Sequence, residues 1–273
     1  MARQFAVSTY LYRQRRLLRD HLLEIAAHGF TALELFASRS HVDYHNASVV
    51  ADVQQWLAEA RLELTSVHAP VTETSLASAD TKEREAALAE VERALHIARR
   101  IPFRVLIVHL GRPRADNVRG GTNRDAARRS IDALATAADP LGVRIAVEVI
   151  PNDLCRASSL AQLIDEDIEH ANAGICLDLG HARLEGDVAD AVETVSGHLM
   201  AMDVHDNRGR TDEHLVPFDG VIDWPSALTT VQKVGYDGAL TFELSARGST
   251  KETLARARQA RTRMEGLLDA RLH

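Results

Sequence analysis

Two short apolar segments near the middle of the chain decide the fold: RIAVEVIP at residues 144–151 and AGICLDLGHA at residues 173–182. Both are dominated by aliphatic side chains and have the length of a strand rather than of a helix. Nearly continuous apolar runs of this kind are typical of parallel strands, whose two faces are both covered. The two segments therefore predict neighbouring strands of an α/β protein.

Segments of the same kind occur on both sides of this pair and bring the predicted strands to eight. The other six are residues 5–12, 32–37, 64–70, 104–111, 199–207 and 238–245. Amphipathic stretches such as residues 81–100 separate them, Gly29 and Gly142 are placed to end helices, and Gly235 precedes the last strand. Eight βα units of about 34 residues each predict a (β/α)₈ TIM barrel.

A doubly wound open sheet is the alternative α/β architecture. Its usual nucleotide-binding signatures, GxGxxG and GxxxxGK[ST], do not follow the first predicted strand. No Pro-, Gly- or Ser-rich linker divides the chain, so residues 1–273 are expected to form a single barrel domain.

Composition restricts the classes of partner. Lys and Arg total 32 against 39 Asp and Glu, and the resulting net charge of −7 disfavours nucleic acid as the main partner. No apolar run is long enough to cross a membrane, and residues 5–12 with the arginines after them reverse the order of a secretory signal. Cys155 and Cys176 are too few for a disulfide framework, which favours a cytoplasmic protein. The sequence leaves open whether it forms a homo-oligomer.

Metal-binding residue types recur at the carboxyl ends of successive predicted strands. They are His68, His109, Glu148, Asp178 with His181, His205, and Glu243. A closed barrel brings these strand ends to one mouth, where active sites of this fold lie. Because an ionised side chain buried without a partner costs several kcal/mol, the recurrence predicts a metal site.

Glu148, Asp178, His205 and Glu243 would supply three carboxylates and one imidazole. Such a mostly hard donor set suits Mn²⁺, Mg²⁺ or Co²⁺, and Zn²⁺ remains open. His68 and His109 are expected either to bind substrate or to ligate a second ion. Two further expectations concern the substrate. Phe36 and Trp224 either form an apolar wall beside a sugar ring or belong to the core, and a phosphate could be held by Arg112, Arg114, Arg119 and Arg124.

Six segments carry a family resemblance: SVHAP, VHLG, AVEVIPN, ICLDLGHA, DVHDNRGRTDEHLVPFDGVIDW and GYDGALTFEL. They run from the third to the eighth predicted strand and resemble the xylose isomerase-like TIM-barrel superfamily, in particular its sugar phosphate isomerase/epimerase branch. The resemblance implies that the shared mononuclear metal ligands are Glu148, Asp178, His205 and Glu243. It also implies that His181 and an arginine after His205, either Arg208 or Arg210, hold substrate hydroxyls.

The chemistry expected at such a site is proton transfer next to a carbonyl of a sugar, sugar phosphate or inositol-type polyol, through an enediolate. Glu148 and Glu243 would be the acid/base pair. Action on opposite faces of the substrate gives epimerisation and action on one face gives isomerisation. Loss of a β-hydroxyl gives dehydration, as in inosose dehydratase-like relatives. These residues do not separate the three outcomes.

A different functional class within the same superfamily also fits the residue types. The endonuclease IV branch, which binds three zinc ions and acts on abasic DNA, has a ligand pattern similar to His68, His109, Glu148, Asp178, His181, His205, Asp212, His214 and Glu243. Against it stand the surrounding segments VEVIPN and LDLGHARLEGD, an aromatic content of 4% and the net charge of −7. In a purely structural reading, Asp212 and His214 brace the loop before Trp224.

Two other functional interpretations of the sequence remain. The ketohexose 3-epimerases are a related branch in which a second glutamate contacts substrate six residues after the first catalytic one, and this chain has Leu154 at that position. A tagatose or psicose epimerase is therefore disfavoured. A barrel that keeps its metal but only binds sugar is the non-catalytic alternative.

Overall fold

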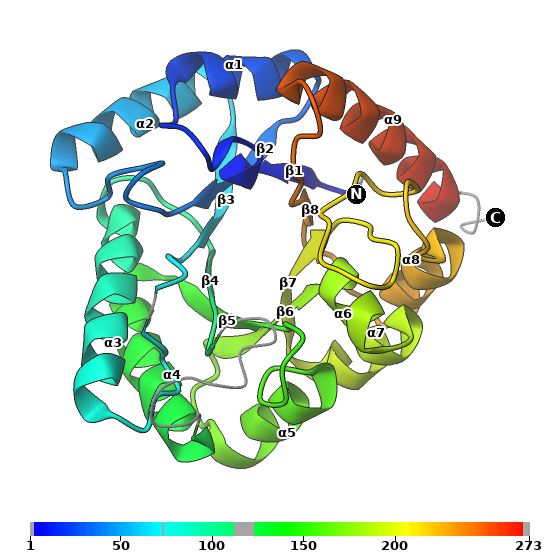
Figure 1. The fold of residues 1–273 in the computed structure, drawn as a ribbon. Helices are drawn as coiled ribbons and strands as arrows, with labels where there is room; N and C mark the ends of the chain where they lie inside the picture. The colour runs from blue at the N-terminus through cyan, green and yellow to red at the C-terminus, as the bar shows by residue number, and fades with distance from the viewer. Residues whose placement is uncertain (1–2, 73, 112–122, 270–273) are drawn as a thin grey trace.

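The barrel closes as predicted. A computed structural model describes residues 3–72, 74–111 and 123–269, in which eight parallel strands pair in chain order and β8 returns to β1 (Figure 1). The strands are β1 (Phe5–Ser8), β2 (Ala32–Phe36), β3 (Glu63–His68), β4 (Val105–Val108), β5 (Arg144–Glu148), β6 (Ala173–Asp178), β7 (Leu199–Val204) and β8 (Leu240–Phe242). The open doubly wound sheet is thereby excluded.

Helices surround the strands, as the view along the barrel in Figure 1 shows. They are α1 (Arg19–Ala27), α2 (Ala47–Ala60), α3 (Thr81–Leu95), α4 (Arg124–Ala138), α5 (Ala157–Asp167), α6 (Leu179–Glu185), α7 (Val188–Val195), α8 (Trp224–Lys233) and α9 (Thr250–Asp269). Short 3₁₀ helices are η1 (Thr9–Tyr12), η2 (His96–Arg99), η3 (Asp139–Leu141) and η4 (Ser196–His198). Among the helices described, none has the length and apolar character that a membrane span requires.

Local sequence explains where these helices begin and end. The side chains of Asp80 and Asn123 accept hydrogen bonds from the first backbone N–H groups of α3 and α4, as good N-caps do. Gly29, Gly142 and Gly235 have positive φ, at 83°, 65° and 73°, which confirms their predicted role in ending helices and leading into the last strand.

The observed strands are shorter than the predicted segments because polar side chains turn the chain at their ends. Ser8 ends β1 and its hydroxyl accepts from the N–H of Tyr10, which starts η1 within the predicted strand. Asp178 ends β6 and accepts from the N–H of His181, so the second half of residues 173–182 is the start of α6. Both turns lie at the mouth of the barrel.

The main hydrophobic core lies between strands and helices, and a smaller one fills the barrel. Side chains alternate along a strand, so Ala146 faces the same side as Glu148, and Cys176 the same side as Asp178. Ala146 and Cys176 belong to a separate inner cluster with Val105, Ile107 and Ala201. Small inner residues leave the space beneath the mouth to polar side chains.

Two of those polar side chains are acids that are fully buried. Glu34 accepts a hydrogen bond from Ser66 at 2.9 Å, and Asp203 accepts one from the Cys176 thiol at 3.2 Å. Burial raises the pKa of both carboxyl groups, which favours their neutral forms. The ionised side chains are therefore expected at the mouth of the barrel and not at Glu34 and Asp203.

Candidate metal centre

The predicted donor residues come together at the carboxyl ends of the strands. Among the described residues, three overlapping groups of His, Asp and Glu place one ligand atom from each member within 4.8 Å of the others. The groups are His68, His109 and Glu148; Glu148, Asp178 and His181; and His181, His205, Asp212 and His214.

In the first group, two imidazoles face one carboxylate oxygen. Oε2 of Glu148 lies 3.0 Å from Nε2 of His68 and 2.6 Å from Nε2 of His109. Burial alone would lower the pKa of His68, but its contact with Glu148 outweighs burial and raises that pKa to about 10. The group is therefore an imidazole pair bound to a fully buried anion.

The second group shares Glu148 with the first. Its Oε1 lies 3.0 Å from Nδ1 of His181, which is also 3.7 Å from Oδ1 of Asp178. Burial by itself would raise the pKa of Glu148, but the imidazole of His109, helped by His181 and His68, lowers it well below its usual value. Glu148 is consequently ionised and connects the two groups.

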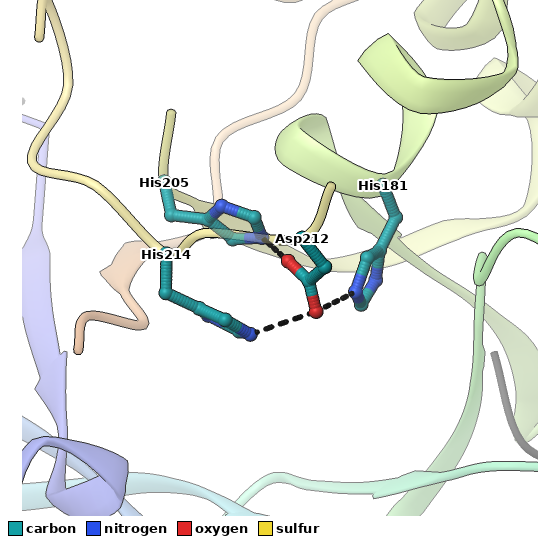
Figure 2. Close-up of side chains that lie close together, drawn as sticks. All are labelled: His181, His205, Asp212 and His214. Atoms are coloured by element: carbon teal, nitrogen blue, oxygen red, sulfur yellow. Dashed lines mark hydrogen bonds and ion pairs between the residues drawn. The ribbon is translucent and has the colours of Figure 1, made fainter. Parts of the chain in front are cut away.

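The third group surrounds Asp212, as Figure 2 shows. Oδ2 of Asp212 lies 3.2 Å from Nε2 of His181 and 3.1 Å from Nε2 of His214, and Oδ1 lies 3.6 Å from Nε2 of His205. His205 is fully buried, and its Nε2 is also 3.0 Å from Oδ1 of Asp178. Two residues of the loop between β7 and α8, Asp212 and His214, thus meet His181 of α6 and His205, which directly follows β7.

Close packing of α6 against the strand end after β7 requires glycine at one position. A Cβ on Gly180 would lie 2.0–2.5 Å from three ring atoms of His205. The absent side chain lets the first turn of α6 approach that ring, which brings His181 and His205 to centroids 5.5 Å apart.

Several buried donor atoms have no hydrogen-bond partner, which is the test of whether these residues fit a metal ion. The unpaired atoms at the mouth are Nδ1 of His109, Oδ2 of Asp178, Nδ1 of His181 and Nε2 of His205. Two of them lie 3.0 Å from a carboxylate oxygen without hydrogen-bond geometry, as donors directed toward a common ion would. The five imidazoles and three carboxylates of the groups are ligands that divalent transition metals accept.

Glu243 follows β8 and is buried, but it lies outside these three groups of described residues. Its Oε2 is 3.3 Å from Nδ1 of His214, which also lies 3.0 Å from the Glu243 carbonyl oxygen. Burial, and then the negative charge of Glu148, raise the pKa of Glu243 to about 8. The two glutamates therefore differ in protonation, and the predicted role of Glu243 as a ligand stays a prediction.

The arginines expected to bind substrate are held elsewhere or lie on the surface. Arg208 is exposed and its Nη1 lies 2.5 Å from Oε1 of Glu213; Arg210 is exposed on the same loop. Arg124, expected to hold a phosphate, is instead paired with Asp167 and, at 2.7 Å, with Glu166. Arg112, Arg114 and Arg119 lie outside the described residues.

The two aromatic residues expected near the site have different environments. Trp224 is only 1% exposed and belongs to the core, so the alternative of a sugar-facing wall is wrong for it. Phe36 is partly buried beside His68, with ring centroids 5.3 Å apart, and packs edge-on against Tyr10. Leu154 is partly buried against the core in the loop after β5.

Tyr10 and Asp206 belong to the site although the sequence did not single them out. The Tyr10 ring lies 4.6 Å from that of His214, and burial together with the charge of Glu243 raises the pKa of its hydroxyl. Asp206 accepts five N–H hydrogen bonds in the loop that carries Asp212 and His214. Tyr10 lies in a segment that resembles a strand, and Asp206 in one that resembles any polar loop.

Comparison with known proteins agrees with the barrel fold. Residues 22–267 match the family model of the xylose isomerase-like TIM barrel. The chain belongs to that family. A relative over most of this barrel is an uncharacterized protein of Methanocaldococcus jannaschii, which is 26% identical over 248 residues, 88% of this chain and 83% of the relative.

Two further matches carry the names of sugar enzymes. The D-psicose 3-epimerase of Agrobacterium fabrum is 23% identical over 231 residues, which are 82% of this chain and 78% of the epimerase. A crystal structure of a D-tagatose 3-epimerase-like protein superposes with a TM-score of 0.84 at 23% identity, over 99% of this chain and 100% of that one. At this identity the structural likeness establishes the shared fold.

Proposed function

We propose that this barrel is a divalent-metal-dependent epimerase or isomerase of a sugar or related polyol. The observation that carries the proposal is a difference in surroundings: three imidazoles lie within 3.0 Å of the Glu148 carboxylate, whereas the buried Glu243 carboxylate has the His214 imidazole at 3.3 Å. Imidazoles keep Glu148 ionised, whereas burial and the charge of Glu148 raise the pKa of Glu243. Two carboxyl groups whose environments separate their pKa values are the usual sign of an acid/base pair.

In the proposed reaction, ionised Glu148 accepts a proton from the carbon next to the substrate carbonyl. Protonated Glu243 donates its proton to the same carbon from the opposite face, so the configuration of that carbon inverts. The step leaves Glu148 protonated and Glu243 ionised, and proton exchange with water restores both groups before the next turnover. Tyr10, whose raised pKa keeps its hydroxyl protonated, would donate a hydrogen bond to a substrate oxygen.

The ion would be held by Glu148, Asp178, His205 and the ionised form of Glu243, with His181, Asp212 and His214 beside them and His68 and His109 available for a second ion. When bound, a divalent ion acts as a Lewis acid toward the negative charge that develops on the substrate oxygen. Mn²⁺, Mg²⁺, Co²⁺ and Zn²⁺ are all candidates, and the imidazole content of the three groups adds weight to Co²⁺ and Zn²⁺.

The names of the relatives support a ketose as the first substrate class to test. Leu154 lies where the ketohexose 3-epimerases have a substrate-contacting glutamate, so the specific substrates psicose and tagatose are not part of the proposal. Phosphorylated sugars and inositol-type polyols belong in the same test. We place the enzyme in the cytoplasm, because its two cysteines are buried and free.

The experiment is elemental analysis of the purified protein followed by a D₂O exchange screen over ketoses, aldoses, their phosphates and inosose-type polyols. Deuterium at a single carbon identifies the substrate and the site of proton transfer. Product analysis then distinguishes inversion, a carbonyl shift and dehydration. Bound metal with no exchange into any polyol would favour a barrel that only binds sugar.

A second candidate is a phosphodiesterase that acts on abasic DNA, and one observation favours it. The three donor groups share Glu148 and His181, so they offer more positions than a single ion needs. Multinuclear centres suit in-line displacement at phosphate. Three bound zinc ions with incision of an abasic duplex would establish this candidate and refute the sugar epimerase.

A further inference from the structure

The loop of residues 207–224 is organised around one buried carboxylate, that of Asp206. Oδ1 accepts from the backbone N–H groups of Asn207, Val221 and Ile222 at 2.9, 3.0 and 3.2 Å. Oδ2 accepts from the N–H of Phe218 at 3.1 Å and from Nε1 of Trp224 at 2.8 Å. Asp206 is fully buried, so these five donors replace the water that would otherwise solvate it.

The backbone of the loop takes conformations that need such an anchor. His214 and Phe218 have φ values of 47° and 77°, in the left-handed region that residues other than glycine seldom adopt. A Cβ on Gly220 would lie 2.2 Å from Oδ1 of Asp206, so the loop closes directly onto the carboxylate. Asp206 and Leu215 also exchange two backbone hydrogen bonds of 2.8 Å.

The neighbouring residue extends the anchor to α6. The Asn207 side-chain amide donates to the carbonyl of Gly180 at 2.7 Å, and its oxygen accepts from the N–H of Gly209 at 2.8 Å. Gly180 immediately precedes His181. The dipeptide after His205 therefore contacts both segments that deliver the remaining members of the third donor group.

We propose that Asp206, with Asn207, is a positioning residue that holds Asp212 and His214 in the metal-binding arrangement before any ion binds. The inference rests on the proposed function, because it presumes that the third donor group takes a divalent ion. It adds that the loop is assembled by protein contacts and not by the ion. Outer contacts that orient ligands in this way typically contribute 10- to 100-fold to metal affinity.

The test substitution is Asp206→Asn, which keeps the shape of the side chain. An asparagine side chain has one oxygen and one NH₂ group, and the NH₂ group faces some of the five N–H groups that donate to the carboxylate. The loop therefore loses hydrogen bonds whichever way the amide is oriented. We expect the apoprotein to bind Co²⁺ about 10- to 100-fold more weakly, with altered visible absorption of the bound ion. We also expect trypsin to cleave apo Asp206→Asn after Arg208 or Arg210 and saturating Co²⁺ to restore protection.

Two further variants separate positioning from general stability. Asp223→Ala removes the N-cap of α8 at an exposed residue and is expected to lower the melting temperature without changing Co²⁺ affinity. Trp224→Phe removes one of the five donors and is expected to weaken Co²⁺ binding less than Asp206→Asn. If Asp206→Asn does not fold, the Co²⁺ affinity of Trp224→Phe tests the inference in its place.

The outcomes are distinct. Wild-type affinity and absorption in Asp206→Asn, or an equal loss of affinity in Asp223→Ala, would overturn the inference while leaving the proposed function intact. If Asp206→Asn does not fold, unchanged affinity in Trp224→Phe would overturn it. A wild-type protein that binds none of Mn²⁺, Mg²⁺, Co²⁺ and Zn²⁺ would instead remove the proposed function, and this inference with it.

Discussion

Nε2 of His109 lies 2.6 Å from Oε2 of Glu148, the shortest contact that this buried carboxylate makes with its three imidazole neighbours. Its other oxygen lies against His181, so one side chain joins two groups of donors. In the proposed function such a residue takes part in both ion binding and proton transfer.

Glu148→Gln is expected to reduce turnover by at least about 10²-fold, because the amide cannot accept the proton. Metal content measured on the same preparation shows whether the ion has also been lost. Glu166→Gln, an exposed glutamate paired with Arg124, serves as the matched control and should be fully active. Near-normal turnover of Glu148→Gln with metal still bound would remove Glu148 from the mechanism.

Removal of the ion is expected to destabilise the protein. A ligand present at 100 times its dissociation constant stabilises the native state by about 2.7 kcal/mol, provided that it does not bind the unfolded chain. Differential scanning calorimetry of chelated protein, with and without added Co²⁺, measures the change. His205→Ala should abolish the rise in melting temperature, whereas His170→Ala, at an exposed site far along the chain, should retain it. A rise of equal size in His205→Ala would contradict the assignment of the site.

Acid sensitivity is expected from a histidine that is not a member of the three donor groups. His41 is buried, its Nδ1 lies 2.7 Å from the Arg15 carbonyl oxygen, and its Nε2 has no hydrogen-bond partner among the described residues. Burial lowers its pKa below the ordinary 6.5. The unfolded chain therefore takes up the proton first, so stability is complete above about pH 6.5 and falls as the pH decreases below that value.

His41→Asn keeps a donor for the Arg15 carbonyl but cannot titrate, and urea unfolding from pH 7.5 to pH 5 should show a shallower loss of stability than in the wild type. His28→Asn is the matched control, because His28 makes the same ring-to-carbonyl contact at 2.7 Å but is only partly buried. An identical pH slope in wild type and His41→Asn would show that other groups cause the acid loss.

The barrel and most of the donor residues were predictable because both depend on periodic features of the sequence. Strand segments recur at the spacing of one βα unit, and parallel strands necessarily direct Glu148 and Asp178 to the same end. Strand ends were less predictable, since Ser8 and Asp178 stop their strands through local side-chain bonds within otherwise apolar or mixed segments.

The grouping of the donors was not predictable for a different reason. Whether Asp212 approaches His205 depends on the path of a loop, and that path is determined by Asp206, whose five bonds leave no pattern in the sequence. Trp224 illustrates the same point, because its indole N–H donates to the Asp206 carboxylate and its ring packs in the core, so the side chain does not face a substrate. Spacing predicts which strand end a residue occupies, whereas loop contacts determine its neighbours.

Gly180 provides a test of the close approach between α6 and His205. In Gly180→Ala the added methyl group would overlap ring atoms of His205 at 2.0–2.5 Å, so either the ring or the first turn of α6 must move. Because His205 contacts both Asp178 and Asp212, we expect the metal content to fall clearly. We expect the melting temperature to change little. Gly186→Ala, at the other end of α6, meets nothing within 4 Å and should bind metal as the wild type does. Full metal content in Gly180→Ala would mean that the ring position of His205 is not what the ion requires.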